Sequence, residues 1–308
     1  MNQKMTTQTN MTRRILLRVA YDGTNYHGWQ LQPNAATIEG ELNRALSALT
    51  GEEIAVTGAS RTDAGVHALG NVAVFDTTSR IPAEKFSYAL NQRLPEDIVI
   101  QSSKQVADDF HPRHCDCRKT YEYDILNRTF PLPAYRNTAY FLYGTLDIEA
   151  MRRACQAFLG EHDFASFCAA GAQVQTTVRT IYSLEVECRP LTEAGTPVPP
   201  ASGEAVNAAA GKSGEQVQQA QPASGEAAIR AAGGTNAGSA DQLLTIRVKG
   251  NGFLYNMVRI IAGTLVEVGR GHIKPEEVAG IIAAKDRAKA GSTAPARGLR
   301  LVEIEYLQ

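Results

Sequence analysis

Short segments in which polar and apolar residues alternate recur along the chain, and they constrain its fold more than any other feature. Residues 118–126 (RKTYEYDIL), 178–188 (VRTIYSLEVEC) and 299–306 (LRLVEIEY) are examples. Such alternation predicts strands with one face buried and one face in water, whereas strands of a parallel sheet are nearly continuous apolar runs. We therefore expect a mainly antiparallel sheet, covered on one face by helices, in an α+β fold.

Helical patterns lie between these strands. The first part of the chain predicts helices that begin near Thr37 and Pro82, between strands over residues 14–21, 54–59, 66–75 and 98–105. The second part predicts strands over 118–126, 178–188, 242–249 and 299–306, and helices over 147–160, 251–268 and 274–285. Because the second order of elements resembles the first, we divide the chain into an N-terminal half over 13–115 and a C-terminal half over 116–308.

Two segments depart from the composition of a folded domain. Residues 1–12 are polar and predict a disordered tail rather than a secretory signal. Residues 190–241 contain no Phe, Tyr or Trp and repeat the hexapeptide PASGEA. Such a segment cannot bury enough apolar area to offset the entropy lost on ordering. We therefore expect a disordered low-complexity insertion within the C-terminal half.

Composition and charge exclude several classes of protein. The 308 residues are 44% hydrophobic, yet no apolar run reaches the length of a membrane span, so we expect no membrane association. Five cysteines without a disulfide-scaffold spacing indicate reduced thiols and a cytoplasmic protein. A net charge of −1 restricts any nucleic-acid site to a local basic patch. No glycine-rich phosphate loop opens a helix, so a nucleotide cofactor has no support.

A carboxylate and a guanidinium lie in a tight turn within residues 58–75 (GASRTDAGVHALGNVAVF). Asp63 and Gly65 suit an ordinary turn, in which the aspartate bonds to its own backbone. The turn nevertheless holds more polar groups than its shape requires, and a carboxylate that attacks carbon must stay ionised. A nearby guanidinium lowers the pKa of such a group. Because Arg61 is too close along the chain, a second arginine from elsewhere is the better partner.

Arg259 is a candidate for that partner. It lies inside the apolar stretch 251–268, where the neighbouring residues predict at least partial burial. A buried arginine needs an acidic partner, whereas an arginine whose stem lies along apolar surface can still reach water. Both interpretations remain open from the sequence.

Residues 110–123 (FHPRHCDCRKTYEY) combine three kinds of signal. Two histidines and two cysteines are metal-ligand types, but all four fall within residues 111–117, and one tight segment rarely surrounds a zinc ion. Basic residues interleaved with Tyr121 and Tyr123 suit a nucleic acid, whose phosphates attract cations and whose bases stack on flat rings. An amphipathic strand with both tyrosines on the core face is the simpler alternative. We predict no metal site.

Seven motifs, in order, resemble those of the TruA family of tRNA pseudouridine synthases. They are YDGTNYHGWQLQP, GASRTDAGVHALGNVAVF, FHPRHCDCRKTYEY, HDFASFCAAG, TVRTIYSLEV, NGFLYNMVRIIAGTLVEVGRG and APARGLRLVEIEY. The resemblance implies the pseudouridine synthase fold, in which two similar halves share one sheet. It further implies an isomerase that needs no cofactor, acts as a homodimer, and converts uridine to pseudouridine at positions 38, 39 or 40 of the tRNA anticodon stem-loop.

The resemblance also implies roles for single residues. Asp63 would be the catalytic nucleophile, Arg259 its partner, Tyr121 the contact to the target uracil, and Arg61 the residue that helps to displace the target base. Cys168 departs from the family pattern, because many members have a basic residue there, so one phosphate contact would be lost.

Three other functions remain as alternatives. The chain could be an RNA-binding protein that keeps the fold without catalysis, although such a protein needs no nucleophile. It could be a zinc-dependent hydrolase built around residues 111–117. It could also be a synthase that acts on another RNA.

Overall fold

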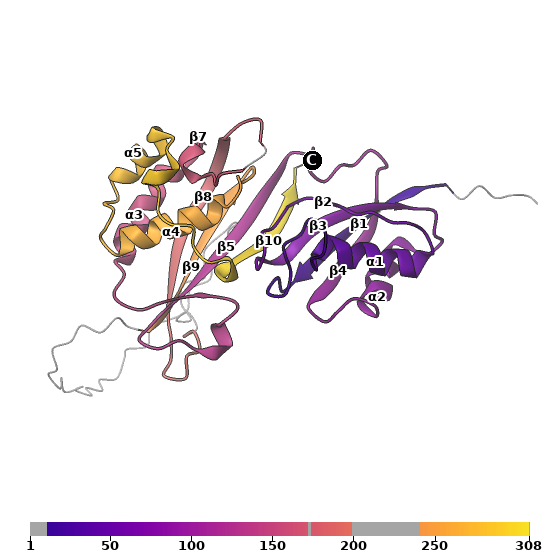
Figure 1. Ribbon diagram of the computed structural model, residues 1–308, viewed down its shortest axis with the longest axis horizontal. Helices are drawn as coiled ribbons and strands as arrows, with labels where there is room; N and C mark the ends of the chain where they lie inside the picture. Colours follow the sequence, from indigo (N-terminus) through magenta and orange to yellow (C-terminus); the bar gives the residue numbers. More distant parts are fainter. Residues whose placement is uncertain (1–10, 172–173, 199–240, 308) are drawn as a thin grey trace, which may run out of the picture.

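The computed structural model describes residues 11–171, 174–198 and 241–307. In these residues ten strands form one sheet in the order β4-β1-β3-β10-β5-β9-β8-β7, with β2 paired to β3 and β6 paired to β5. The pairs β10–β3 and β5–β6 are parallel, and the other pairs are antiparallel. This mainly antiparallel sheet with its helices (Figure 1) confirms the predicted α+β fold.

The first part of the sheet has two helices. Its elements are β1 (Arg13–Tyr21), α1 (Ile38–Thr50), β2 (Thr57–Gly58), β3 (His67–Thr77), α2 (Phe86–Asn91) and β4 (Ile98–Val106). Thr37 caps α1 as predicted, because its side chain accepts a hydrogen bond from the Gly40 N–H, and Gly51 ends the helix with a φ of 74°. After Pro82 the chain first forms a 3₁₀ turn over Ala83–Lys85, so α2 begins later than predicted.

The second part of the sheet has three helices. Its elements are β5 (Cys117–Asn127), β6 (Tyr140–Leu142), α3 (Ile148–Cys155), β7 (Gly160–Asp163), β8 (Val178–Pro190), β9 (Gln242–Gly250), α4 (Met257–Gly269), α5 (Glu277–Ala284) and β10 (Leu299–Tyr306). Strands β6 and β7 were not predicted, because segments of three and four residues are too short to display alternation.

Helix α4 is shorter than the predicted helix over 251–268. It begins at Met257, because Asn256 has a φ of 60° and therefore lies in the left-handed region, which a helix cannot include. The preceding loop is held by β8 instead: the Asn251 N–H donates to the carbonyl of Thr180 (3.0 Å), and the Asn251 side chain accepts from the Thr180 N–H (2.9 Å). This loop leads directly to the arginine at position 259.

The last strand joins the two parts of the sheet. Strand β10 runs parallel to β3, with Arg300 opposite His67, and antiparallel to β5, with Leu301 opposite Tyr121. The C-terminal strand therefore places the beginning of β3 near the middle of β5 (Figure 1).

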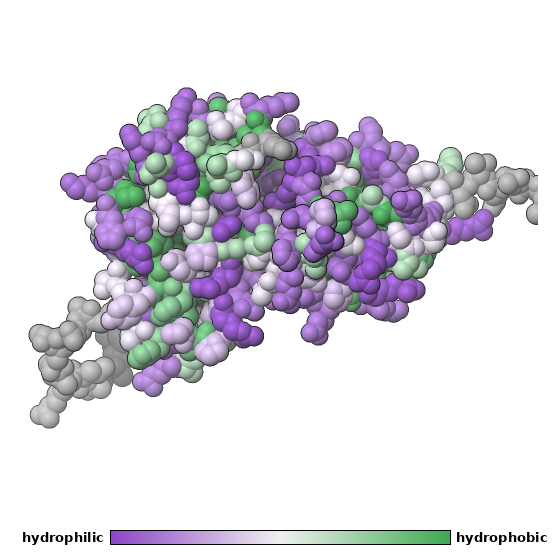
Figure 2. All heavy atoms as spheres, in the orientation of Figure 1, coloured by the Kyte–Doolittle hydropathy of each residue, from purple (hydrophilic) through white to green (hydrophobic). Residues whose placement is uncertain are grey.

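The two faces of the sheet differ. Alternate strand residues, among them Leu17, Phe75, Tyr123 and Leu301, belong to one continuous core that also includes residues of all five helices of the described chain. On the other face a small apolar cluster lies near Phe110, and charged residues cover much of the rest. The view in Figure 2 shows a mostly hydrophilic surface with small, separate apolar patches.

None of the described helices is both long enough and apolar enough to cross a membrane. Residues 1–10 of the predicted tail and 199–240 of the predicted insertion lie outside the described residues. At the described beginning of that insertion, Leu191 and Pro197 form a β-bridge, and the Val198 N–H donates to the carbonyl of Pro190 (2.8 Å).

Candidate active site

Asp63 lies in the loop between β2 and β3, and the segment that follows β1 holds this loop in place. The Trp29 N–H donates to the carbonyl of Thr62 (3.0 Å), and the hydroxyls of Tyr21 and Thr62 are 2.7 Å apart. Gly28 has a φ of 90°, and a Cβ at this position would lie 2.6 Å from the Thr62 carbonyl oxygen. Only glycine permits so close an approach. The segment after β1 therefore fixes the shape of the Asp63 loop.

Arg259 of α4 meets Asp63, although the two residues are 196 positions apart in the chain. The arginine Nη1 lies 3.1 Å from the aspartate Oδ2, and the two side chains are 17% and 22% exposed. The same Nη1 donates to the Asn256 side chain (2.6 Å), while the arginine Nε donates to the carbonyl of Ala294 (2.8 Å). The guanidinium is thus fixed by three acceptors, one of which is the Asp63 carboxylate.

The pKa of Asp63 is raised above its ordinary value of 3.8. Burial is the largest cause, because it penalises the charged carboxylate, and the charge and hydrogen bond of Arg259 oppose it. The sequence led us to expect a lowered pKa, and this expectation was wrong in its net direction. The arginine acts in the predicted direction, but the loss of water around the loop outweighs it. The result is a poorly hydrated carboxylate beside a fixed positive charge.

Tyr121 of β5 lies beside this carboxylate. Its ring is buried and meets Phe253 edge to face, with 5.2 Å between the ring centroids. Burial raises the pKa of Tyr121 to about 12, the negative charge of Asp63 adds to the rise, and a hydrogen bond with Ser60 opposes it. Tyr123 lies on the same face of β5, but its hydroxyl donates to the carbonyl of Pro295 (2.8 Å). Of the two tyrosines, Tyr121 therefore belongs to the site and Tyr123 supports the fold.

Arg61 is exposed, and within the described chain it forms no hydrogen bond or ion pair. The structure therefore brings Asp63, Tyr121 and Arg259 together, whereas Arg61, two residues before Asp63, is exposed and does not contact the carboxylate.

The histidine- and cysteine-rich segment has structural contacts. The rings of His111 and His114 stack with 3.9 Å between their centroids, and the Cys115 thiol donates to the carbonyl of His111 (3.2 Å). Across residues 11–171, 174–198 and 241–307, no group of three or more His, Cys, Asp or Glu side chains could hold a metal ion.

Three residues of the site were missed from the sequence: Ser60, Phe253 and Asn256. Asn256 could have been identified from its residue type and its position in the sequence. Asparagine is one of the few residues that enter the left-handed region readily, and the spacing of three residues to Arg259 is the spacing at which helical side chains meet. The other two gave no comparable signal, because the sequence does not reveal that the loops after β2 and β9, which carry them, lie next to Tyr121.

Comparison with known proteins identifies the family of the chain. Residues 18–114 and 154–307 match the sequence profile of a family described as tRNA pseudouridine synthase. Asp63 and Arg259 fall within the matched residues, and Tyr121 falls between the two matched ranges. The chain belongs to the tRNA pseudouridine synthase family.

Individual relatives match over nearly their whole length. The chain is 44% identical to tRNA pseudouridine synthase A of Ruminiclostridium cellulolyticum over 294 residues, which cover 96% of this chain and 100% of the relative. The proteins of the same name from Thermoanaerobacter sp. and Acetivibrio thermocellus are each 42% identical, with the same coverage.

Proposed function

We propose that this protein isomerises uridine to pseudouridine in the anticodon stem-loop of tRNA, at positions 38, 39 or 40, with Asp63 as the nucleophile. One observation carries the proposal: in a chain of the tRNA pseudouridine synthase family, a partly buried aspartate is paired with Arg259 (3.1 Å) and lies beside the ring of Tyr121.

The reaction breaks the bond between N1 of uracil and C1′ of ribose, and forms a bond between C5 and C1′. C5 loses its proton and N1 gains one, so the product is an isomer of the substrate and no electrons are exchanged. Two routes use Asp63: attack on C1′, which displaces uracil, or removal of a ribose proton. Both require the ionised carboxylate, which Arg259 favours against the effect of burial.

The other side chains act on the base. The target nucleotide has to leave its stack, at a cost of a few kcal/mol. Arg61, exposed and without a partner in the described chain, fills the space that the base leaves and meets the RNA. Tyr121 holds the detached uracil against its ring while the base turns.

We also propose a cytoplasmic homodimer in which the tRNA lies across both subunits. The five cysteines are free, which suits a reducing compartment. Light scattering of the purified protein with and without tRNA tests the assembly.

Release of tritium from tRNA labelled at C5 of uracil tests the activity, since forming the new bond expels that hydrogen. The wild type should release tritium, and Asp63→Asn should release none while still binding tRNA. Absence of release by the wild type, with tRNA bound, would favour the alternative of an RNA-binding protein without catalysis.

A further inference from the structure

Two cations project from the same face of the sheet as Tyr121. Lys119 precedes Tyr121 by two residues on β5 and is opposite Gly250 of β9, which is in turn opposite Ile181 of β8. Arg179 precedes Ile181 by two residues. Because strand residues two apart share a face, Lys119 and Arg179 lie on this one face, and the strand between them has no side chain at position 250.

The contacts of these two cations are with neutral groups. The Lys119 Nζ donates to the carbonyl of Ala59 (2.9 Å), at the entrance to the loop that carries Asp63. The Arg179 guanidinium donates to the nearby carbonyls of Thr176 (3.0 Å) and Val178 (2.6 Å). Neither side chain forms an ion pair with a carboxylate anywhere in the described chain.

The two charges are also partly removed from water. Burial lowers the pKa of Lys119, the positive charges of Arg113 and Arg179 lower it further, and Cys117 opposes the change. Burial also lowers the pKa of Arg179. Like charges that share a poorly hydrated region without a counter-ion are unfavourable, and an anion bound between them would relieve both effects.

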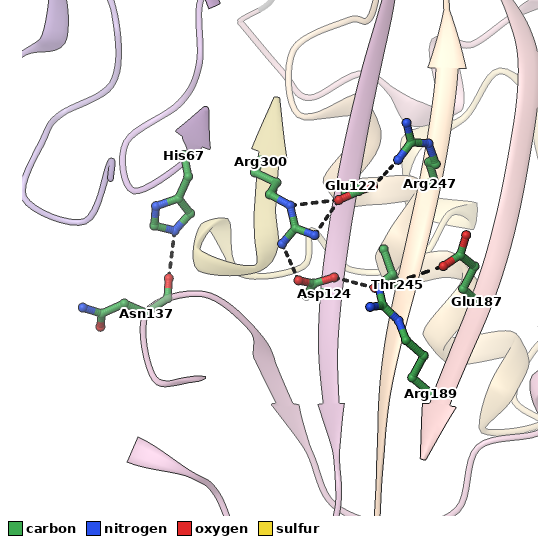
Figure 3. A network of polar contacts seen from close by, with 9 residues as sticks. All are labelled: His67, Glu122, Asp124, Asn137, Glu187, Arg189, Thr245, Arg247 and Arg300. Carbon is green, nitrogen blue, oxygen red and sulfur yellow. Dashed lines mark hydrogen bonds and ion pairs between the residues drawn. The ribbon is translucent and has the colours of Figure 1, made fainter. Parts of the chain in front are cut away.

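The opposite face of the sheet provides a contrast (Figure 3). There Arg300 bonds to both Glu122 and Asp124, and Arg247 bonds to Glu122. Lys249 is likewise paired with Glu305 (2.7 Å). Cations that are paired with carboxylates of the protein attract a polyanion only weakly. Lys119 and Arg179 have no such partners in the described chain and can therefore attract one more strongly.

We infer that Lys119 and Arg179 form a phosphate-binding site for the RNA strand that carries the target uridine. The ligand is the phosphodiester backbone, which point charges on long side chains bind without reading sequence. A backbone held here keeps the nucleotide next to Tyr121 and Asp63 while its base turns. The inference rests on the proposed function, because it takes RNA as the substrate.

The test measures the dissociation constant of a tRNA transcript over a range of salt concentrations, with all proteins carrying Asp63→Asn so that no turnover occurs. Lys119→Gln and Arg179→Gln should each reduce the slope of log K against log salt by about 0.7 to 0.9. Between about 50 and 200 mM salt, each variant should therefore lose about threefold less affinity than its parent.

Charge-matched controls separate a local site from a general effect of charge. Arg247→Gln removes one positive charge from the opposite face, where Glu122 remains paired with Arg300, and its slope should equal that of the parent. Lys119→Arg and Arg179→Lys keep the charge and should keep the slope. Both glutamine variants are compared only after their melting temperatures match the parent. If Lys119→Gln unfolds, the slope of Arg179→Gln alone tests the inference. This variant should stay folded, because the Arg179 side chain bonds only to neighbouring carbonyls.

An unchanged slope in the glutamine variants would overturn the inference, as would an equal reduction in Arg247→Gln. These outcomes are distinct from failure of the proposed function. If the protein with Asp63 intact releases no tritium, the proposed isomerase activity is refuted, but the salt dependence of binding is unaffected by that result. If tritium release is normal and the salt slopes of the variants are unchanged, only the phosphate-binding site is refuted.

Discussion

Replacing Arg259 should move the pH dependence of the reaction in a defined direction. Burial raises the pKa of Asp63, and Arg259 opposes that rise. In Arg259→Gln the effect of burial remains and the opposition is gone, so the pKa of Asp63 should rise further. Since a carboxyl group loses its charge as the pH falls through its pKa, activity on the acid side should fail at a higher pH in the variant than in the wild type.

The size of this change follows from the separation of the two charges, since the Arg259 Nη1 lies 3.1 Å from the Asp63 Oδ2. Two unit charges about 4 Å apart attract by about 4 kcal/mol at an effective dielectric constant of about 20. At about 1.4 kcal/mol per pKa unit, this corresponds to an upper limit of about three units. Carboxylates beside an arginine have pKa values lowered by about one to three units. We expect the acid limb of kcat/KM to move up by an amount in that range.

The assay is tritium release at low tRNA concentration across the acid and neutral range, because kcat/KM reports the pKa of the free enzyme. Arg259→Lys keeps a positive charge and should show a smaller displacement. A lower maximal rate with an unmoved acid limb would refute the reasoning, since it would show that Arg259 affects activity without controlling the ionisation of Asp63.

Two further predictions concern the stability of the core and the role of the Tyr121 ring. A Cβ on Gly263 would lie 1.8 Å from the Ser292 carbonyl oxygen, so Gly263→Ala should destabilise the protein by about 1 to 3 kcal/mol or more and lower its melting temperature. Gly280→Ala in α5 is the control and should not lower it, because an added Cβ there would meet nothing within 4 Å beyond its chain neighbours and its own helix backbone. Tyr121→Phe keeps the ring and loses one hydrogen bond, so its rate of tritium release in a single turnover should be about 2- to 12-fold lower. Tyr121→Ala removes the ring, and its rate of tritium release should be much lower still. Equal losses in the two Tyr121 variants would show that the hydroxyl, not the ring, is needed.

The strands were predictable because their pattern is local. The strand predicted over 299–306 is β10 with the same bounds. The alternation at 118–126 predicted a strand, and one of its two interpretations, with Tyr121 on the core face, agrees with the buried ring in β5. Helix boundaries were less predictable. The apolar residues within 251–268 suit a helix throughout, and only the backbone conformation of Asn256 delays its start to Met257.

The site itself could be predicted only in its parts. Asp63 and Arg259 each suggested a need for a partner, but their meeting depends on how β10 and β5 bring distant segments together. The direction in which the pKa of Asp63 is shifted could not be predicted for the same reason. Hydration of a loop depends on what packs over it, which here is the segment around Trp29 and Gly28.

The position of β10 has a consequence for how the protein is made. This strand follows the other described strands along the chain, yet it lies in the middle of the sheet, between β3 and β5. Before it is added, no strand joins β3, which follows the loop with Asp63, to β5, which carries Tyr121. The contacts between them span long stretches of chain, and such contacts form slowly. A chain that lacks β10 is therefore not expected to hold Asp63 and Tyr121 together. Pairing of β10 with β3 and β5 is thus the step at which we expect the proposed active site to assemble.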